Sequence, residues 1–488
     1  MATVYETVIG LEVHVELATE TKMFCGCPTA FGAPPNTQVC PVCLGLPGSL
    51  PVPNARAIAY ALKAALALEC EIDPECRWDR KNYHYPDLPK GYQITQYARP
   101  LARSGHLRFS ITETNGDTVD REVRIRRLHM EEDTGKSTHE GLPGTSTGVD
   151  LNRAGVPLIE IVSEPDIRTP EEARVYLQAL RTLLLYTGVS DVKMEEGSLR
   201  CDANVSVRPV GEDTLGVLVE IKNMNSFRSV QRALEFEVNR QVDLLQSGGR
   251  IVRETRHWDD RREITFSSRS KEEAHDYRYF PEPDLGPCDL TPAFVEQTRQ
   301  SLPELPTAKC QRYISLGLSG YDASVLAMDP PLASFFDAML RAGGAPRESA
   351  ALLTVELLGR LNATGIAIHD PACRVTPSAL AELQKLVADG TINGKIAKEV
   401  LDEMVQTGAT ARTVVENRGL RQVSDEGAIL EAVRSVLTAN PVEVADYRDG
   451  KEKLFGFLVG QVMKATRGKA NPALVNAVLR RELQGRSE

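Results

Sequence analysis

The feature that most constrains the fold of this chain is a change in hydrophobic period near Leu290. Before it, apolar and polar residues alternate, as in LEVHVEL at 11–17 and LRCDANVSV at 199–207. Such alternation is typical of β-strands with one buried face. After it, apolar residues recur every three or four positions, which is the period of amphipathic helices. The chain therefore joins a β-rich part to a helical part, and we expect an α+β fold.

A chain of 488 residues is too long for a single hydrophobic core, so two to four domains are expected. The strands predict a mainly antiparallel sheet, curved and with helices on one side, over residues 1–292. The helical pattern that follows predicts an all-α domain over 293–408. A further break near residue 409 predicts a small α-helical tail domain over 409–488.

Two helices are expected inside the β-rich part. Thr169-Pro170-Glu171-Glu172 has the form of a capping box with proline at the first helical position, and Gly188 ends that helix. Ser226 begins the second helix, which stops at Gly248.

The bulk composition excludes some function classes. A formal net charge of −10 argues against a chain that coats nucleic acid over its whole surface. The N-terminus lacks the basic and apolar regions of a signal peptide, and apolar runs such as AIAYALKAALAL are too short to span a bilayer. We therefore expect a cytoplasmic protein that is not bound to a membrane.

The net charge of the C-terminal segment is opposite in sign to that of the whole chain. From Lys451 onward the bases outnumber the acids, and the local charge is +5. The bases are Lys451, Lys453, Lys464, Arg467, Lys469, Arg480, Arg481 and Arg486. This positive charge predicts a binding surface for a polyanion. A helical face exposed to solvent is the alternative and explains the same residues equally well.

Four of the ten cysteines form two close pairs, Cys25 with Cys27 and Cys40 with Cys43. In a reducing compartment disulfides are not expected. Two such pairs across a short loop suit a tetrahedral zinc ion with four thiolate ligands and no open position. The alternative is four unliganded thiols. A zinc ion here would be structural and would stabilise the loop rather than catalyse a reaction.

Several strands carry acids on a single face. Alternation places Glu12, His14 and Glu16 on the face opposite Val13. Strand 199–207 adds Asp202 on its polar face, and strand 219–222 adds Lys222. Glu160 lies inside an apolar run, where an unpaired carboxylate would be destabilising. An antiparallel sheet could bring these faces together with the acids of LHMEED at 128–133. Exposed faces of sheets are often charged, but a buried Glu favours a divalent-metal site that bridges phosphates.

The Gly-Lys-Ser at 135–137 is not a phosphate loop of the Walker type. That loop needs a glycine five residues before Gly135, where this chain has Met130. We expect Lys136 and Ser137 to lie on a loop.

Several long strings identify a family by resemblance. IGLEVHVEL, RLHMEEDTGKSTHE, VKMEEGSLRCDANVSVR and DYRYFPEPDL closely resemble the B subunits of the tRNA-dependent amidotransferases, over essentially the whole chain. The resemblance implies a cradle domain related in fold to glutamine synthetase, a helical domain, and a tail that contacts tRNA. It implies ATP-dependent phosphorylation of the side chain of Glu-tRNA(Gln) or Asp-tRNA(Asn), followed by amidation. It also implies a heterotrimer in which an amidase partner, tied on by a small third protein, delivers ammonia through a tunnel.

Carried over to this chain, the resemblance makes His14, Glu132 and Glu160 the expected Mg²⁺ ligands, with Glu12 and Glu131 beside them. Because histidine is an unusual ligand for Mg²⁺, Mn²⁺ is expected to substitute well. Asp202 would hold a metal-bound water and Lys222 a phosphate. Lys136 and Ser137 would touch the nucleotide or the tRNA end. The segment DRKNYHYPDLPKGYQ at 79–93 would stack on the terminal adenosine or line the ammonia exit, and aromatic packing is its alternative.

Two other functions remain open. A non-catalytic, zinc-containing tRNA-binding scaffold would keep its function when the acidic residues are neutralised. A stand-alone glutamine-dependent enzyme would need its own nucleophile, but no amidase signature is present and Cys201 falls on the apolar face of its strand. The sequence does not decide between Glu-tRNA(Gln) and Asp-tRNA(Asn).

Overall fold

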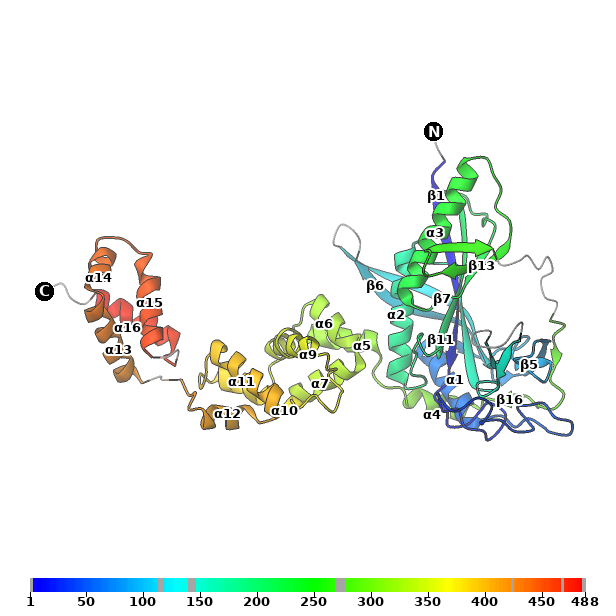
Figure 1. Ribbon diagram of the computed structural model, residues 1–488, viewed down its shortest axis with the longest axis horizontal. Helices are drawn as coiled ribbons and strands as arrows, with labels where there is room; N and C mark the ends of the chain where they lie inside the picture. The colour runs from blue at the N-terminus through cyan, green and yellow to red at the C-terminus, as the bar shows by residue number, and fades with distance from the viewer. Residues whose placement is uncertain are drawn as a thin grey trace. The chain divides into compact units, whose positions relative to one another are not determined.

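The computed structural model describes residues 3–112, 117–138, 146–267, 277–422, 425–466 and 469–484 (Figure 1). The chain divides into two compact units, Met1–Ala308 and Lys309–Glu488. The first unit extends past residue 292, because α4 (Pro292–Gln300) packs on α1 (Ala55–Ala67) through partly buried Phe294 and Val295.

A nine-stranded sheet forms the centre of the first unit, in the order β14-β13-β12-β11-β1-β10-β7-β6-β2. Every pair of neighbours in it is antiparallel except β12 and β13, which are parallel. The strands are β1 (Tyr5–Glu16), β2 (Glu71–Ile72), β6 (Ala102–Thr112), β7 (Thr118–Glu132), β10 (Pro157–Ser163), β11 (Leu199–Pro209), β12 (Val219–Lys222), β13 (Glu254–Asp259) and β14 (Ile264–Ser267). The predicted α+β class is thus confirmed.

Helices cover one face of this sheet, as α2 (Pro170–Thr187) and α3 (Phe227–Gln246) show in Figure 1. Residues of α1, α2 and α3 share a core with Ile9, Leu11, Val13 and Val15 of β1. The expected helix ends are confirmed. The Thr169 hydroxyl accepts a hydrogen bond from the Glu172 amide at the start of α2.

Three small sheets complete the first unit. They pair β3 (Glu75–Cys76) with β16 (Cys288–Asp289), β4 (Asp79–Asn82) with β5 (Tyr92–Thr95) and β15 (Phe280–Pro281), and β8 (Lys136–Thr138) with β9 (Gly148–Asp150). Strand β5 also packs on β7, which brings the second of these sheets against the polar face of the large one.

The described residues of the second unit are helical and contain two hydrophobic cores. The first core lies among α5 (Pro306–Ser315), α6 (Gly320–Ala327), α7 (Pro330–Arg341), α8 (Pro346–Ala351), the π-helix η1 (Leu352–Leu357), α9 (Leu358–Thr364), α10 (Pro377–Ala388), α11 (Gly394–Thr407) and α12 (Ala411–Asn417). The second lies among α13 (Glu426–Ala439), α14 (Pro441–Arg448), α15 (Leu454–Ala465) and α16 (Pro472–Gln484).

Candidate metal and nucleotide site

A row of polar side chains crosses four strands on the face of the sheet opposite the helices. His14 of β1 lies opposite Glu160 of β10 on one side and Arg200 of β11 on the other. Glu160 in turn lies opposite His129 of β7. Directly opposed residues of antiparallel strands point to the same face. The four side chains therefore share one surface, while Val13 faces the core.

Three of the residues on this face lie close enough to share one ion. Ligand atoms of His14, Glu131 and Glu160 all lie within 4.8 Å of one another, and we call these residues the His14 cluster. Nε2 of His14 is 3.4 Å from Oε2 of Glu160. Two carboxylates and one imidazole suit Mg²⁺ less well than an all-oxygen set and suit Mn²⁺ better.

Neighbouring side chains hold the two carboxylates in place. Nε2 of His129 lies 3.2 Å from Oε1 of Glu131 and 3.4 Å from Oε2 of Glu160. Gln93 and Thr95 of β5 donate hydrogen bonds to Glu131 at 3.0 Å and 2.7 Å. All five of these residues are buried. This dense hydrogen bonding fixes the orientation of both carboxylates.

The electrostatics keep both carboxylates of the cluster ionised. Burial alone would raise the pKa of Glu131, but Lys81 and then His129 lower it to about 2. Burial likewise opposes ionisation of Glu160, and His129 and His14 hold its pKa well below the usual range. Burial disfavours a charged His129, yet Glu160 and Glu131 raise its pKa to about 9. Both carboxylates are therefore ionised at neutral pH, which is the state that binds a cation.

Glu132, which we expected to be a metal ligand, lies outside the His14 cluster. Glu131 and Glu132 are adjacent in β7 and so point to opposite faces. Glu132 forms a buried ion pair with Lys90 and accepts a hydrogen bond from the Ile94 amide at 2.9 Å. Glu131 thus occupies the place in the cluster that we had given to Glu132.

Glu12, Asp202 and Lys222 extend the same polar face beyond the cluster. Glu12 and Asp202 are opposite each other in the β1–β11 register. Burial and then the Glu160 carboxylate raise the pKa of Glu12. Nζ of Lys222 lies 2.8 Å from Oδ2 of Asp202 and 3.0 Å from Oε1 of Glu220. Lys222 is thus held by acids in this structure, and its role toward a phosphate stays a prediction.

Lys136 and Ser137 lie on the short exposed strand β8 rather than on the loop that we expected. Within the described part of the chain, no hydrogen bond or ion pair joins either side chain to the His14 cluster.

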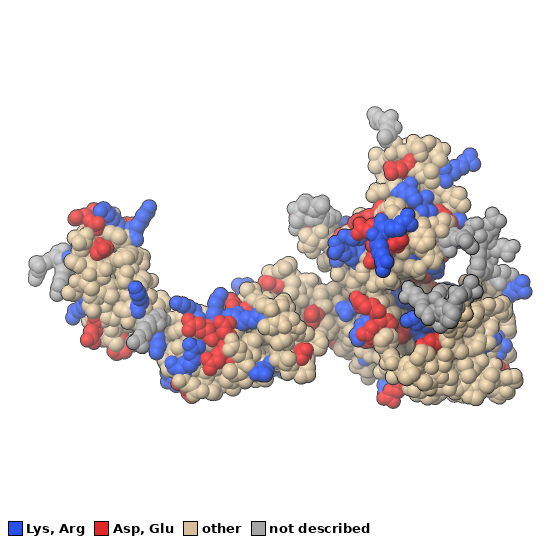
Figure 2. All heavy atoms as spheres, in the orientation of Figure 1, with Lys and Arg blue, Asp and Glu red and all other residues tan. Residues whose placement is uncertain are grey.

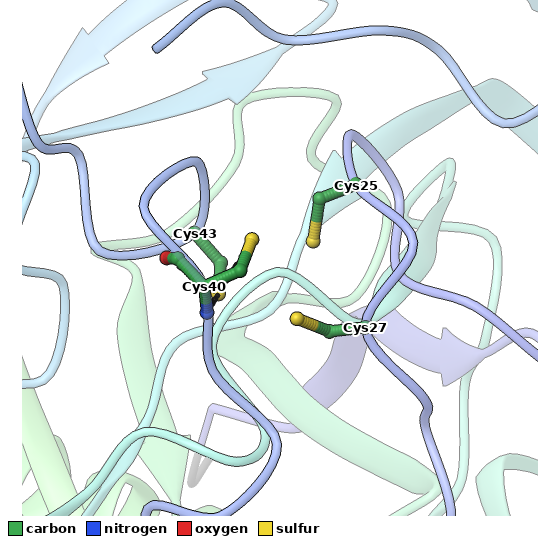
Figure 3. Close-up of side chains that lie close together, drawn as sticks. All are labelled: Cys25, Cys27, Cys40 and Cys43. Atoms are coloured by element: carbon green, nitrogen blue, oxygen red, sulfur yellow. Dashed lines mark hydrogen bonds between the residues drawn. The ribbon is translucent and has the colours of Figure 1, made fainter.

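The four predicted zinc ligands come together from two loops (Figure 3). Their Sγ atoms lie within 4.8 Å of one another, and we call Cys25, Cys27, Cys40 and Cys43 the cysteine site. The Cys40 amide lies 3.2 Å from Sγ of Cys43, the kind of N–H···S contact that favours a thiolate. A hydrogen bond from Cys25 lowers the pKa of Cys43 to about 4 against the effect of burial. The donor set fits zinc.

The aromatic and basic segment at 79–93 is largely engaged within the protein. Arg80 donates a hydrogen bond to Glu282 at 2.6 Å, and its guanidinium lies 4.1 Å from the centre of the Tyr92 ring. The rings of Tyr83 and Tyr85 are 4.7 Å apart. Aromatic packing therefore accounts for part of the pattern, and contact with the tRNA end stays a prediction.

The basic residues near the C-terminus do not form one continuous patch on the face drawn in Figure 2, where acids lie between them over α13–α16. Arg481 pairs with Glu426 at 2.8 Å and Lys451 with Asp446 at 2.8 Å. Arg467 and Arg486 lie outside the described residues. The binding surface for a polyanion stays a prediction.

Sequence reasoning placed His129 with Glu131 and Glu132 beside the acidic faces but gave it no role at the ion. His129 alternates with Glu131 on the polar face of β7. Lys81 was assigned only to the aromatic and basic segment. Gln93 and Thr95 were not selected, because only the packing of β5 on β7 brings them to the cluster.

Comparison with known proteins shows the class of the molecule. A family model described as the GatB/GatE catalytic domain matches residues 7–296, and one described as the GatB domain matches residues 334–483. The chain is 54% identical to the B subunit of the aspartyl/glutamyl-tRNA(Asn/Gln) amidotransferase of Brevibacillus brevis, with 98% of this chain and 99% of the relative covered. The corresponding protein of Carboxydothermus hydrogenoformans is 53% identical and that of Persephonella marina 54%, each over 98% of this chain and at least 99% of the relative.

These matches cover most of both units, so the architecture is that of an amidotransferase component with a catalytic sheet domain and a helical part. The chain belongs to the family of the B subunits of aspartyl/glutamyl-tRNA(Asn/Gln) amidotransferases.

Among the described residues, no helix combines the length and the hydrophobicity needed to cross a membrane.

Proposed function

We propose that this chain activates the side-chain carboxylate of Glu-tRNA(Gln), Asp-tRNA(Asn) or both by ATP-dependent phosphorylation, and that the activated acyl group then reacts with ammonia. The observation that carries the proposal is the His14 cluster, a half-buried histidine and two buried, ionised carboxylates on the polar face of the domain that matches the family's catalytic model. We propose that the chain acts in the cytoplasm.

The chemistry explains why such a site is needed. A carboxylate cannot be attacked directly by ammonia, because the leaving group would be oxide. Transfer of the γ-phosphoryl group of ATP to the carboxylate oxygen makes a mixed anhydride, and ammonia then displaces phosphate from its carbonyl carbon. Substrate carboxylate and triphosphate are both anions, so their approach requires positive charge between them.

His14, Glu131 and Glu160 would hold a divalent ion, Mg²⁺ or Mn²⁺, and the ion would supply that positive charge. His129, Gln93 and Thr95 hold the carboxylates in orientation. Lys222 would turn from Asp202 toward a phosphate, and Glu12 and Asp202 would orient metal-bound water. The site would have to exclude water, which would otherwise hydrolyse the mixed anhydride.

The partners follow from the proposed reaction. Cys201 is buried in the core of the first unit, where it cannot serve as the nucleophile of a glutaminase. Ammonia would therefore come from a separate amidase partner through an internal tunnel, with a small third protein completing a heterotrimer. We further propose that the cysteine site holds a structural zinc ion and that the helical tail contacts the tRNA.

The test is an amidation assay with the chain co-purified with its amidase and small partners, supplied with Glu-tRNA(Gln), ATP, Mg²⁺ and ammonium. Ammonium bypasses the glutaminase, so the assay reports this chain's own chemistry. Wild type is compared with His14→Ala and Glu160→Gln, and ADP and Gln-tRNA are followed together. Glu164→Gln is the matched control, because Glu164 pairs with Arg126 near the surface, 2.8 Å away.

We expect both cluster variants to bind tRNA but to lose ADP and Gln-tRNA formation, while the control keeps both. Variants of the cluster that amidate like wild type would contradict the proposal and would favour the non-catalytic scaffold. Repeating the assay with Asp-tRNA(Asn) shows which substrate the complex accepts.

A further inference from the structure

A fully buried lysine lies against the cysteine site. Lys22 has no exposed surface, although lysine is almost never completely buried without a partner. Its Nζ lies 3.7 Å from Sγ of Cys43 and 3.2 Å from the carbonyl oxygen of Leu151. Its main-chain amide donates a hydrogen bond to the Cys27 carbonyl at 2.9 Å, so Lys22 is also part of the first cysteine loop.

The burial of this ammonium group needs an anion nearby, because a buried and unpaired charge is strongly destabilising. Among the described residues, no carboxylate lies within ion-pairing distance of Nζ. Glu132 lines the same cavity as Lys22, but Lys90 already forms its ion pair. Four neutral thiols would not supply the missing charge, whereas a Cys43 thiolate alone would supply one negative charge. A zinc ion with four thiolate ligands would supply a net charge of −2.

We propose that Lys22 is a positioning residue of the cysteine site, neutralising part of the negative charge of the metal-bound thiolates and holding Cys43 through an N–H···S hydrogen bond. The inference rests on the proposed zinc site, and it assigns a role to a residue outside the four ligands. Groups that hydrogen-bond to metal ligands typically change metal affinity by about 10–100-fold.

The same contacts connect the metal loop to the sheet domain. Lys22 holds the Leu151 carbonyl just after β9, and the next residue, Met23, donates its amide to the Gly155 carbonyl at 2.7 Å. Gly155 has a φ of +89° and lies between Lys22, Cys43 and Glu132, where an added Cβ would come within 3.9 Å of all three. Lys22 therefore joins the cysteine site to the segment that leads into β10.

The test measures zinc affinity in the full-length chain. Wild type, Lys22→Met and Lys22→Gln are loaded with zinc, and the metal is titrated away with a chromophoric chelator of known affinity. Methionine keeps the length and removes the charge, and glutamine keeps a hydrogen-bond donor. Lys309→Met is the matched control, because Lys309 is also buried but pairs with Asp337 in the second unit.

We expect zinc to bind about 10–100-fold more weakly to both Lys22 variants and unchanged to the control. Cobalt substitution gives a second readout, in which the thiolate charge-transfer bands of both Lys22 variants appear only at higher cobalt concentration. Wild-type affinity in Lys22→Met would overturn the inference, and so would full recovery in Lys22→Gln, because then the charge is not what matters. A wild-type chain that binds no zinc would instead overturn the zinc site itself, and the role of Lys22 with it.

Discussion

His14 and Glu160 lie directly opposite each other on adjacent strands, with Nε2 of the histidine 3.4 Å from Oε2 of the carboxylate. The two residues are far apart in the sequence and meet only because β1 pairs with β10. Their contact raises the pKa of His14 above its ordinary value in spite of burial. A divalent ion would displace that proton and take both groups as ligands.

Replacing His14 with alanine should weaken Mn²⁺ binding at least about tenfold, since one of three protein ligands is lost. Electron paramagnetic resonance of free Mn²⁺ during a titration of the full-length chain measures this directly. His106→Ala is the control, because His106 lies on β6 and contacts Glu69 rather than the cluster. Equal affinities in His14→Ala and wild type would show that the ion binds elsewhere.

His129 should act through its N–H donor rather than as a ligand. Glutamine can place an amide N–H near the position of Nε2, whereas leucine cannot. We therefore expect His129→Gln to retain much of the Mn²⁺ affinity and His129→Leu to lose about 10–100-fold, in the same resonance titration. Equal losses in the two variants would argue that the imidazole itself contacts the ion.

The buried pair Lys90–Glu132 should behave as a coupled unit. The two side chains are only 7% and 3% exposed, so removing one partner leaves an uncompensated charge. Lys90→Met should destabilise the first unit by about 3–5 kcal/mol, and Lys90→Met with Glu132→Gln by less than that. Urea denaturation followed by tryptophan fluorescence reports on this unit, because Trp78 and Trp258 both lie in it. A double variant less stable than Lys90→Met would contradict the coupling.

Glu16 should make the first unit less stable as the pH rises. Burial, and then the neighbouring Asp133, raise the pKa of Glu16 from 4.5 to about 8. Between these values the folded chain binds a proton that the unfolded chain has released, so stability falls as the pH rises through this window. The pKa of Asp133 is lowered to about 2, so Asp133 affects the pH dependence of stability only in more acidic solution.

Glu16→Gln keeps a donor toward Asp133 and cannot ionise, so its urea midpoint without added metal should fall less between about pH 5 and pH 8 than that of wild type. Glu20→Gln, which removes an exposed acid from the following segment, should follow wild type. The same slope in Glu16→Gln and wild type would mean that another group titrates in this range.

Much of the fold could be predicted because its signals are local. The alternation around His14 fixes which side of β1 is buried, and the capping residues Thr169 and Ser226 fix where α2 and α3 begin. The cysteine pairs predicted a site that the structure brings together within 4.8 Å. Each signal lies within a few residues of the feature that it predicts.

The rest depends on pairings between distant segments. Local alternation puts Glu131 on the polar face of β7 with His129, but its approach to Glu160 follows from the β7–β10 register, which no local pattern specifies. Lys90 meets Glu132, and Gln93 meets Glu131, only because β5 packs on β7. For the same reason Lys136 and Ser137, which resemble part of a phosphate loop, form an exposed edge of a small sheet.

Because Val13 and His14 alternate in β1, the pairing that buries Val13 also sets the face on which His14 lies. A shift of one residue in the pairing of β1 would turn every side chain of the strand to the other face, placing the His14 imidazole beneath the helices and valines at the position of the His14 cluster. Such a sheet would be unstable, because it would expose the valines of β1 and bury its charged side chains. Substitutions that keep this pairing of β1 therefore also keep His14 on the polar face of the sheet.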